Sequence, residues 1–240
     1  MPEITTSIQK KLNQQGFFYE NTSLTEKDFF DYIQTMNIVP QYGKYDVWTI
    51  QDESDDAKIT HLSKTSLDFT PHIEGVDMAN APRWVVLYGA EESSIEFETY
   101  LVDSYTFLDN LSENEQHILR SIDFVFVDIV GHEHKGPVVR TNSDGNEYIH
   151  VTSRGYFKPR YGTHSVEMEI YEYQPIIDRL TTFFVDPKNR TTTVSIKKGD
   201  LFIFDNLRFL HGRIAQEAEK DMSRKLIRVY AHNNLFKTQT

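Results

Sequence analysis

The sequence predicts a mostly β fold with flanking helices, of the α+β class, in which two sheets form a double-stranded β-helix, or jelly roll. Three observations favour this fold. Short strand-like segments recur along the chain, only a few amphipathic helical segments lie among them, and no linker-like tract or internal repeat divides residues 1–240. Strands do not alternate regularly with helices, which disfavours a parallel α/β sheet. We therefore expect a single domain over residues 1–240.

The predicted strands are short segments that are apolar, β-branched or alternating in polarity. The strongest is Arg83–Tyr88, which Gly89 closes, and a second buried strand, Leu201–Asp205, follows a turn over Lys197–Asp200. Further strands are expected at Val47–Ile50, Glu96–Val102, Phe124–Val130, Thr191–Ile196 and Arg224–His232. An acidic loop is expected at Asp52–Asp56, and turns are expected at His132–Pro137 and Asn142–Asn146.

Three segments are predicted to form helices, namely Thr25–Met36, Ser112–Ser121 and Tyr171–Phe184. Thr25 and Ser112 can each cap the start of a helix, and acidic residues follow them in the first turn, where they suit the helix dipole. In the first helix, apolar residues recur at spacings of three and four and form one stripe. In the third helix, Pro175 lies near the start and Pro187 lies just beyond the end.

Composition excludes several classes of protein. The net charge of −11 disfavours a nucleic-acid-binding surface. The chain has no cysteine, which excludes disulfides, thiolate metal sites and cysteine nucleophiles. The segment Met1–Gln15 lacks the apolar core of a signal peptide, and no apolar run is long enough to span a membrane. We therefore expect a cytoplasmic protein with no nucleic-acid or membrane partner.

Three residues far apart in the sequence form a candidate metal site. His72 and Glu74 are two positions apart, so on a strand their side chains would point to the same face. His211 follows the strand Leu201–Asp205 and a polar corner, and we expect it on a second short strand. Two imidazoles and one carboxylate form the ligand set of non-haem Fe(II) sites. A His-x-Glu pair also arises by chance in a chain of this composition, so the hypothesis needs further residues.

Other motifs give no competing site. The cluster His132-Glu133-His134 lacks the glutamate that a cupin would place four or five residues later, where this chain has Val138 and Val139. We predict that this cluster lies in a solvated loop. Phosphate-binding loops, dinucleotide fingerprints and serine nucleophile elbows are all missing from the sequence. Nucleophilic hydrolysis therefore has no candidate residue.

The candidate ligands belong to an ordered set of short motifs along the chain, namely Pro71–Gly75, Glu98–Asp103, Asp205-Asn206, His211-x-Arg213 and Ser223–Tyr230. This set resembles the taurine dioxygenase and clavaminate synthase-like family of Fe(II)/2-oxoglutarate-dependent oxygenases. The resemblance extends from about Gly16 to Tyr230 and is most distinctive in the C-terminal part. It implies that residues 1–240 form a single Fe(II)/2-oxoglutarate oxygenase domain.

The resemblance also implies roles for particular residues. His72, Glu74 and His211 match the iron ligands of the family. Arg224, thirteen residues after His211, matches the arginine that binds the distal carboxylate of 2-oxoglutarate, and a planar guanidinium can donate two parallel hydrogen bonds to a carboxylate. Thr99 matches a hydroxyl that assists in binding 2-oxoglutarate. The acidic ligand is a glutamate, as in the clavaminate-like branch, and its presence disfavours chlorination.

Two further arginines have open roles. Arg228 follows Arg224 by four positions and would share its strand face, where it binds a substrate carboxylate in some members of the family. A salt-bridged strand arginine is the equal alternative for Arg228. For Arg213 we expect a structural ion pair, with Asp205 as the candidate partner.

The implied activity is that of an Fe(II)/2-oxoglutarate-dependent dioxygenase. We expect it to hydroxylate a free amino acid or a similar small polar metabolite, with dioxygen as oxidant and release of succinate and CO2. Desaturation or another oxidative tailoring reaction is an alternative, because it begins with the same removal of a hydrogen atom. A non-catalytic metal- or ligand-binding jelly roll and a structural or sensing zinc site are the remaining alternatives.

Overall fold

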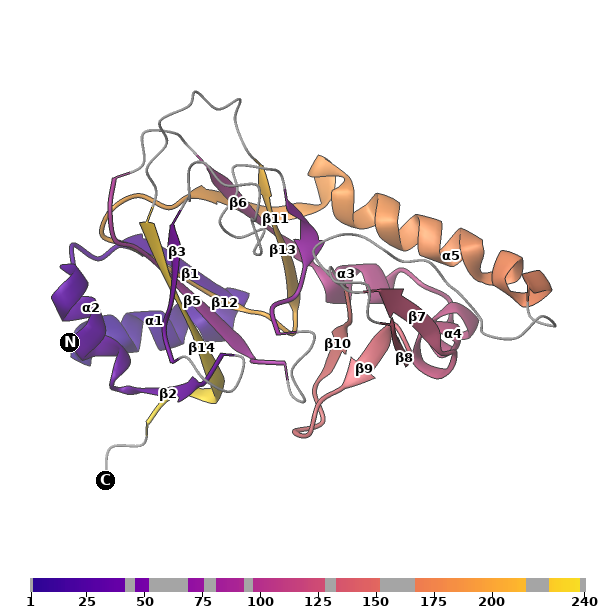
Figure 1. The fold of residues 1–240 in the computed structure, drawn as a ribbon, viewed down its shortest axis with the longest axis horizontal. Helices are drawn as coiled ribbons and strands as arrows, with labels where there is room; N and C mark the ends of the chain where they lie inside the picture. Colours follow the sequence, from indigo (N-terminus) through magenta and orange to yellow (C-terminus); the bar gives the residue numbers. More distant parts are fainter. Residues whose placement is uncertain are drawn as a thin grey trace.

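The structure is a computed structural model that describes residues 2–41, 46–51, 69–75, 81–92, 97–127, 133–151, 167–214 and 225–237. Two antiparallel sheets pack face to face, and helices cover their outer faces (Figure 1). This arrangement is the double-stranded β-helix, so the predicted fold class is confirmed.

The larger sheet supplies one wall of the molecule. Its strands follow the order β1 (Phe17–Asn21), β12 (Asp200–Asp205), β5 (Trp84–Gly89), β14 (Lys225–Phe236) and β2 (Met36–Val39), and β3 (Trp48–Gln51) also pairs with β14. The long strand β14 thus contacts three other strands, all antiparallel to it. Its central position makes it a rigid support for side chains that point inward.

The smaller sheet faces the larger one. Its strands follow the order β11 (Arg190–Ser195), β6 (Glu98–Asp103), β13 (Phe209–Ile214) and β4 (Phe69–His72), so β4 forms an edge. Two hairpins lie beyond this sheet, formed by β7 (Phe124–Val127) with β8 (Glu133–Gly136) and by β9 (Val139–Thr141) with β10 (Glu147–Ile149).

Alternation along the strands divides the apolar side chains between two faces, as period-two geometry requires. In β5, Val86 belongs to a core with the N-terminal helices, whereas Val85 and Leu87 belong to the core between the sheets. In β14, Val229 packs toward the helices and Tyr230 packs between the sheets. The side chain of residue 228, two positions before Tyr230, therefore also points inward.

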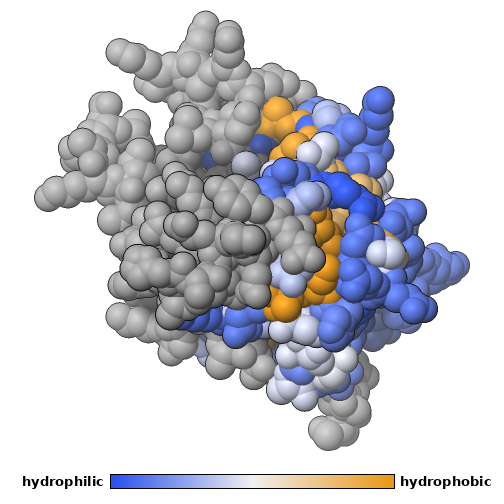
Figure 2. All heavy atoms as spheres, turned by 90° about the vertical axis from the view of Figure 1, so that its right-hand side faces the viewer, coloured by the Kyte–Doolittle hydropathy of each residue, from blue (hydrophilic) through white to orange (hydrophobic). Residues whose placement is uncertain are grey.

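Helices close both outer faces. The first two, α1 (Pro2–Gln15) and α2 (Glu26–Ile33), pack on the larger sheet, where Phe29 stacks on Tyr88 with ring centroids 4.4 Å apart. On the other side, α3 (Ser104–Asp109), α4 (Glu113–Ser121) and α5 (Glu167–Val185) share a core with the smaller sheet and the hairpins, and the short 3-10 helix η2 (Pro187–Asn189) follows α5. Seen from the side that carries α5, the part of the surface formed by described residues is mostly hydrophilic, with hydrophobic residues gathered in a limited area (Figure 2).

Most of the predicted elements are present, with changes at their ends. Thr25 and Ser112 cap α2 and α4 through capping boxes, and the turn over Asn142–Asn146 joins β9 to β10. The first helix ends earlier than predicted, because Met36 begins β2 instead. The third starts at Glu167 and has Pro175 inside it.

The predicted turn over His132–Pro137 is wrong for residues 133–136, which form β8 and pair with β7. His134 therefore lies on a strand, whereas His132 and the segment predicted as an acidic loop, Asp52–Asp56, lie outside the described residues. A search of the helices that the structure describes finds none with the length and apolar character needed to cross a membrane.

Candidate metal centre

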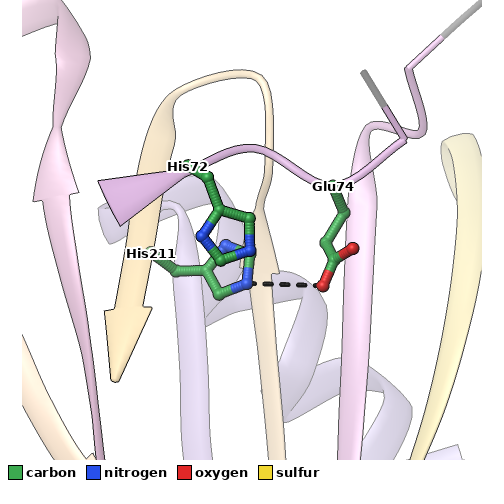
Figure 3. A group of neighbouring side chains, drawn as sticks. All are labelled: His72, Glu74 and His211. Atoms are coloured by element: carbon green, nitrogen blue, oxygen red, sulfur yellow. Dashed lines mark ion pairs between the residues drawn. The ribbon is translucent and has the colours of Figure 1, made fainter. Parts of the chain in front are cut away.

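Sheet register brings the two candidate histidine ligands together. His211 on β13 lies directly opposite His72 at the end of β4, and opposite Leu101 of β6 on its other side. Directly paired residues point to the same face of a sheet. The two imidazole rings consequently lie side by side with centroids 4.2 Å apart, facing the space between the sheets (Figure 3).

The local backbone of β4 fixes the orientation of His72. The register of β4 against β13 shifts by one residue between His72 and Phe69, which marks a β-bulge on the edge strand. Pro71 fits there because an edge strand or a bulge does not require its missing N–H. The Nδ1 atom of His72 lies 2.9 Å from the carbonyl oxygen of Thr70. A carbonyl only accepts, so Nδ1 carries the proton and Nε2 keeps its lone pair for a metal.

Glu74 reaches the histidines from a turn and not, as predicted, from a shared strand face. β4 ends at His72, and Glu74 and Gly75 form the following turn, where Gly75 adopts a φ of 70°. Asn206, at the corner after β12, holds this turn. Its Oδ1 accepts from the backbone N of Glu74 at 2.8 Å, and its Nδ2 donates to the carbonyl oxygen of Glu74 at 3.1 Å.

Three side chains surround the carboxylate of Glu74. Arg228 Nη1 donates to Oε1 at 2.6 Å, the Tyr230 hydroxyl donates to Oε2 at 2.6 Å, and His211 Nε2 lies 3.5 Å from Oε1. Burial by itself would raise the pKa of Glu74. The positive charge of Arg228, together with the His211 contact, outweighs burial and holds the pKa well below its usual range. Glu74 is therefore ionised at neutral pH.

Burial also disfavours the charged form of His72. It lowers the pKa of His72 to about 3, and the proximity of His211 adds to the shift. His72 is therefore neutral at physiological pH, which is the form that binds metals. The ring of His211 packs on Phe204, with centroids 4.9 Å apart, so its position is also fixed.

The donor set fits a divalent transition metal. One ligand atom from each of His72, Glu74 and His211 lies within 4.8 Å of the others. The ionised carboxylate of Glu74 supplies a negative charge that attracts a cation. Among the residues that the structure describes, this is the one such group of three. Two imidazole nitrogens and one carboxylate oxygen form the facial set that suits non-haem Fe(II) and leaves half of an octahedral sphere open.

The predicted residues for the co-substrate are placed in part. Thr99 lies on β6 two residues before Leu101, so its side chain shares the inward face with His211, and it is buried. Arg224 lies outside the described residues and directly precedes β14. Arg228 is buried in the ion pair with Glu74, which corresponds to the salt-bridged alternative for this residue.

The predicted ion pair between Arg213 and Asp205 is wrong. Asp205 pairs instead with Arg83, at 3.2 Å, because the register of β12 places Asp205 opposite Trp84, the residue after Arg83. The guanidinium of Arg213 lies over the ring of Phe97, 5.4 Å from its centroid.

Sequence reasoning missed two residues that contact the site. Tyr230 follows Arg228 by two positions on the same strand, and this spacing could have identified it as a neighbour on the inward face. Gln41 gives no such signal, since it is distant in sequence and follows β2. It is fully buried, and its Oε1 accepts from Arg228 Nε at 3.0 Å.

Solved structures share this fold at low sequence identity. A taurine dioxygenase from Burkholderia xenovorans superimposes with a TM-score of 0.67 and 15% identity, and the match covers 99% of this chain and 83% of that one. An asparagine oxygenase in complex with Fe(II), 2S,3S-3-hydroxyasparagine and succinate gives a TM-score of 0.64 and 15% identity, covering 97% of this chain and 80% of that one.

Sequence comparisons identify the family. The human γ-butyrobetaine dioxygenase is 23% identical over 204 residues, which cover 77% of this chain and 48% of that protein, and the orangutan (Pongo abelii) protein matches to the same extent. The chain thus spans about half the length of these curated relatives. The model of the family described as taurine catabolism dioxygenase TauD, TfdA family matches residues 8–230. The chain therefore belongs to the TauD/TfdA family of dioxygenases.

Proposed function

We propose that this chain is an Fe(II)/2-oxoglutarate-dependent dioxygenase that hydroxylates a free amino acid or a similar small polar metabolite. One observation carries the proposal. Ligand atoms of His72, Glu74 and His211 converge within 4.8 Å inside a double-stranded β-helix, as an Fe(II) site with open coordination positions requires. In this proposal, residues 1–240 act as one domain in the cytoplasm.

In this proposal some site residues bind the metal and others bind 2-oxoglutarate. With iron and 2-oxoglutarate bound, the centre would couple oxidation of the keto acid to succinate and CO2 with oxidation of the substrate. Glu74 is ionised and His72 is neutral before any metal arrives, so neither ligand has to lose a proton at neutral pH. Arg224 would bind the distal carboxylate of 2-oxoglutarate, and Thr99 would donate its hydroxyl to the co-substrate.

The proposed substrate class draws support from the relatives. Their names refer to taurine, asparagine and γ-butyrobetaine, which are all small and polar. The guanidinium of Arg228 is already paired with Glu74, which makes it less available to bind a substrate carboxylate. We therefore propose that Arg228 serves the carboxylate ligand first, and that other groups select the substrate. Desaturation of the same class of molecule is the second candidate reaction.

The test is aerobic incubation of the purified chain with Fe(II), 2-oxoglutarate and a panel of amino acids and their derivatives. We expect succinate to form in step with one product that is heavier by one oxygen atom. A product lighter by two hydrogen atoms would indicate desaturation. His211→Ala serves as the negative control. Bound metal without any succinate above that control, over the whole panel, would contradict the proposal and favour a structural or sensing metal site.

A further inference from the structure

Each oxygen of the Glu74 carboxylate has its own hydrogen-bond donor. Arg228 Nη1 lies 2.6 Å from Oε1, and the Tyr230 hydroxyl lies 2.6 Å from Oε2. His211 Nε2 also faces Oε1, at 3.5 Å. The two oxygens are therefore not equivalent. Oε1 is directed toward the histidine ligands, whereas Oε2 is engaged by a phenol from the opposite sheet.

Both donors come from one rigid strand. Arg228 and Tyr230 are two residues apart on β14, so both side chains leave the larger sheet on its inner face, toward the turn that carries Glu74. Both are almost fully buried, with exposed fractions of 4% and 1%. Arg228 is paired with β3 and β5, and Tyr230 is paired with β2 and β5, which fixes the distance of the donors from the smaller sheet.

Two hydrogen bonds with Gln41 fix the orientation of Arg228. Gln41 Oε1 accepts from Arg228 Nε at 3.0 Å, and Gln41 Nε2 donates to the backbone carbonyl oxygen of Arg228 at 3.0 Å. These two bonds close a ring between the amide and the arginine. The guanidinium is thereby held at the angle at which Nη1 meets Glu74.

We propose that Arg228 and Tyr230 are positioning residues that hold Glu74 so that it offers a metal ion one oxygen only. This inference rests on the proposed metal site. A carboxylate can bind a metal through one oxygen or through both. Turning Oε2 toward the metal would break the bond from Tyr230, and a hydrogen bond to a charged group is stronger than one between neutral groups.

The purpose of a single oxygen ligand follows from the number of coordination positions. With a six-coordinate metal bound, two histidines and one carboxylate oxygen would fill three positions. A keto acid that chelates through two atoms would need two of the remaining three, which would leave one for dioxygen. A second oxygen from Glu74 would occupy one of these positions, so the contacts from β14 keep the co-substrate positions free.

Tyr230→Phe tests the inference, since it removes only the hydroxyl. The probe is Mn(II) alone, bound to the metal-free protein, and the readout is the number of metal-bound waters counted by electron–nuclear double resonance in ¹⁷O-enriched water. We expect three waters in the wild-type protein and two in Tyr230→Phe. Tyr88→Phe is the matched control, because this buried phenol donates to the carbonyl oxygen of Leu24 away from the site, and it should keep three waters.

Arg228→Lys provides a second measurement. It keeps the positive charge, but a single ammonium group cannot contact Gln41 and Glu74 as the planar guanidinium does. We expect Mn(II) affinity about 10-fold weaker, a typical effect of changing a group that orients a ligand. Arg208→Lys, which alters an arginine paired with Asp103, should leave the Mn(II) affinity unchanged.

The outcomes separate this inference from the proposed function. Three waters in Tyr230→Phe, with wild-type affinity in Arg228→Lys, would overturn the positioning role and leave the metal site intact. A wild-type protein that binds no Mn(II) would overturn both. Neither readout depends on turnover, so failure to find a substrate has no bearing on the result.

Discussion

The two histidines and the carboxylate of the candidate metal centre are held by different means. His72 and His211 lie opposite each other on paired strands of the smaller sheet, so the backbone ladder sets their separation. Glu74 lies on a turn, where its backbone is bonded to Asn206 and its carboxylate to side chains of the larger sheet. One part of the site therefore depends on sheet register, and the other on contacts that cross between the sheets.

This difference has a physical consequence. The position of a strand residue changes little when a neighbouring side chain is altered, because many backbone hydrogen bonds together hold the strand in place. A turn residue with a buried charge depends on a few partners, and losing one leaves the charge uncompensated. We expect changes in the histidines to affect metal binding with little effect on folding, and changes around Glu74 to affect both.

The largest expected effect comes from His211→Ala. Removing a strand-held ligand leaves two of the three protein donors, so metal-dependent succinate formation should become undetectable. The free energy of unfolding of the metal-free protein should fall by only about 1 kcal/mol, since the altered side chain leaves the ladder intact. Succinate assays and urea denaturation measure the two quantities. His117→Ala, on the exposed face of α4, is the control, and equal turnover in both variants would remove His211 from the site.

Arg228→Met tests how far Glu74 depends on its contacts with the larger sheet. It removes the cation beside a buried, ionised Glu74, and breaking a buried pair in this way costs about 3–5 kcal/mol of stability. The variant also loses the contact that positions Glu74, so Co(II) should bind it more weakly than the wild-type protein. The increase in melting temperature on adding Co(II) should therefore be smaller in Arg228→Met than in the wild-type protein. A variant as stable as wild type in the absence of metal would show that Glu74 does not need this partner.

The same division explains what could be predicted from the sequence. The buried strand β12 and the polar corner after it predict a second short strand that carries His211, and β13 is that strand, because the backbone ladder alone determines where such residues lie. Glu74 was identified, but for the wrong reason, since the strand ends two residues before it. The His-x-Glu spacing predicts proximity of the side chains but not the turn that produces it.

Side-chain contacts between different strands could not be predicted from local patterns. Gln41 and Arg228 are separated by 187 positions, and no periodicity relates them. The choice of Arg213 as partner of Asp205 failed for the same reason, because the pairing of β12 with β5 brings Arg83 closer. Long-range register decides such pairs, whereas spacing within one segment decides which side chains share a face.

Lowering the pH should separate the contributions of His72 and Glu74 to the free energy of unfolding, because the two side chains titrate in different pH ranges. Burial lowers the pKa of His72 from 6.5 to about 3, so between these values the unfolded chain binds a proton that the folded metal-free protein does not. Stability then falls as the pH falls, by about 1.4 kcal/mol per pH unit, or about 2 kcal/mol from pH 6.5 to 5. The pKa of Glu74 is lowered from 4.5, so its contribution is lost only at lower pH.

Urea denaturation of the metal-free protein at several pH values, with a chelator present, measures this dependence. His72→Asn should flatten the curve between pH 6.5 and 5 and leave the loss at lower pH in place. Arg228→Met should have the opposite effect, changing mainly the acidic end. Identical slopes for His72→Asn and the wild-type protein above pH 5 would contradict the assignment of this range to the strand-held histidine.

The smallest expected effect concerns Thr99, which shares the register-determined face with His211 but does not belong to the ligand set. Thr99→Val removes one hydroxyl and keeps the side-chain volume, so the loss is that of one hydrogen bond to the co-substrate, about 1.4 kcal/mol. This corresponds to a KM for 2-oxoglutarate raised about 10-fold. The Mn(II) affinity should not change, because the metal ligands are untouched. Thr193→Val, at an exposed position on β11 of the same sheet, is the control and should leave the KM and the Mn(II) affinity unchanged. A weaker Mn(II) affinity in Thr99→Val would contradict this prediction and would indicate that Thr99 supports the metal ligands.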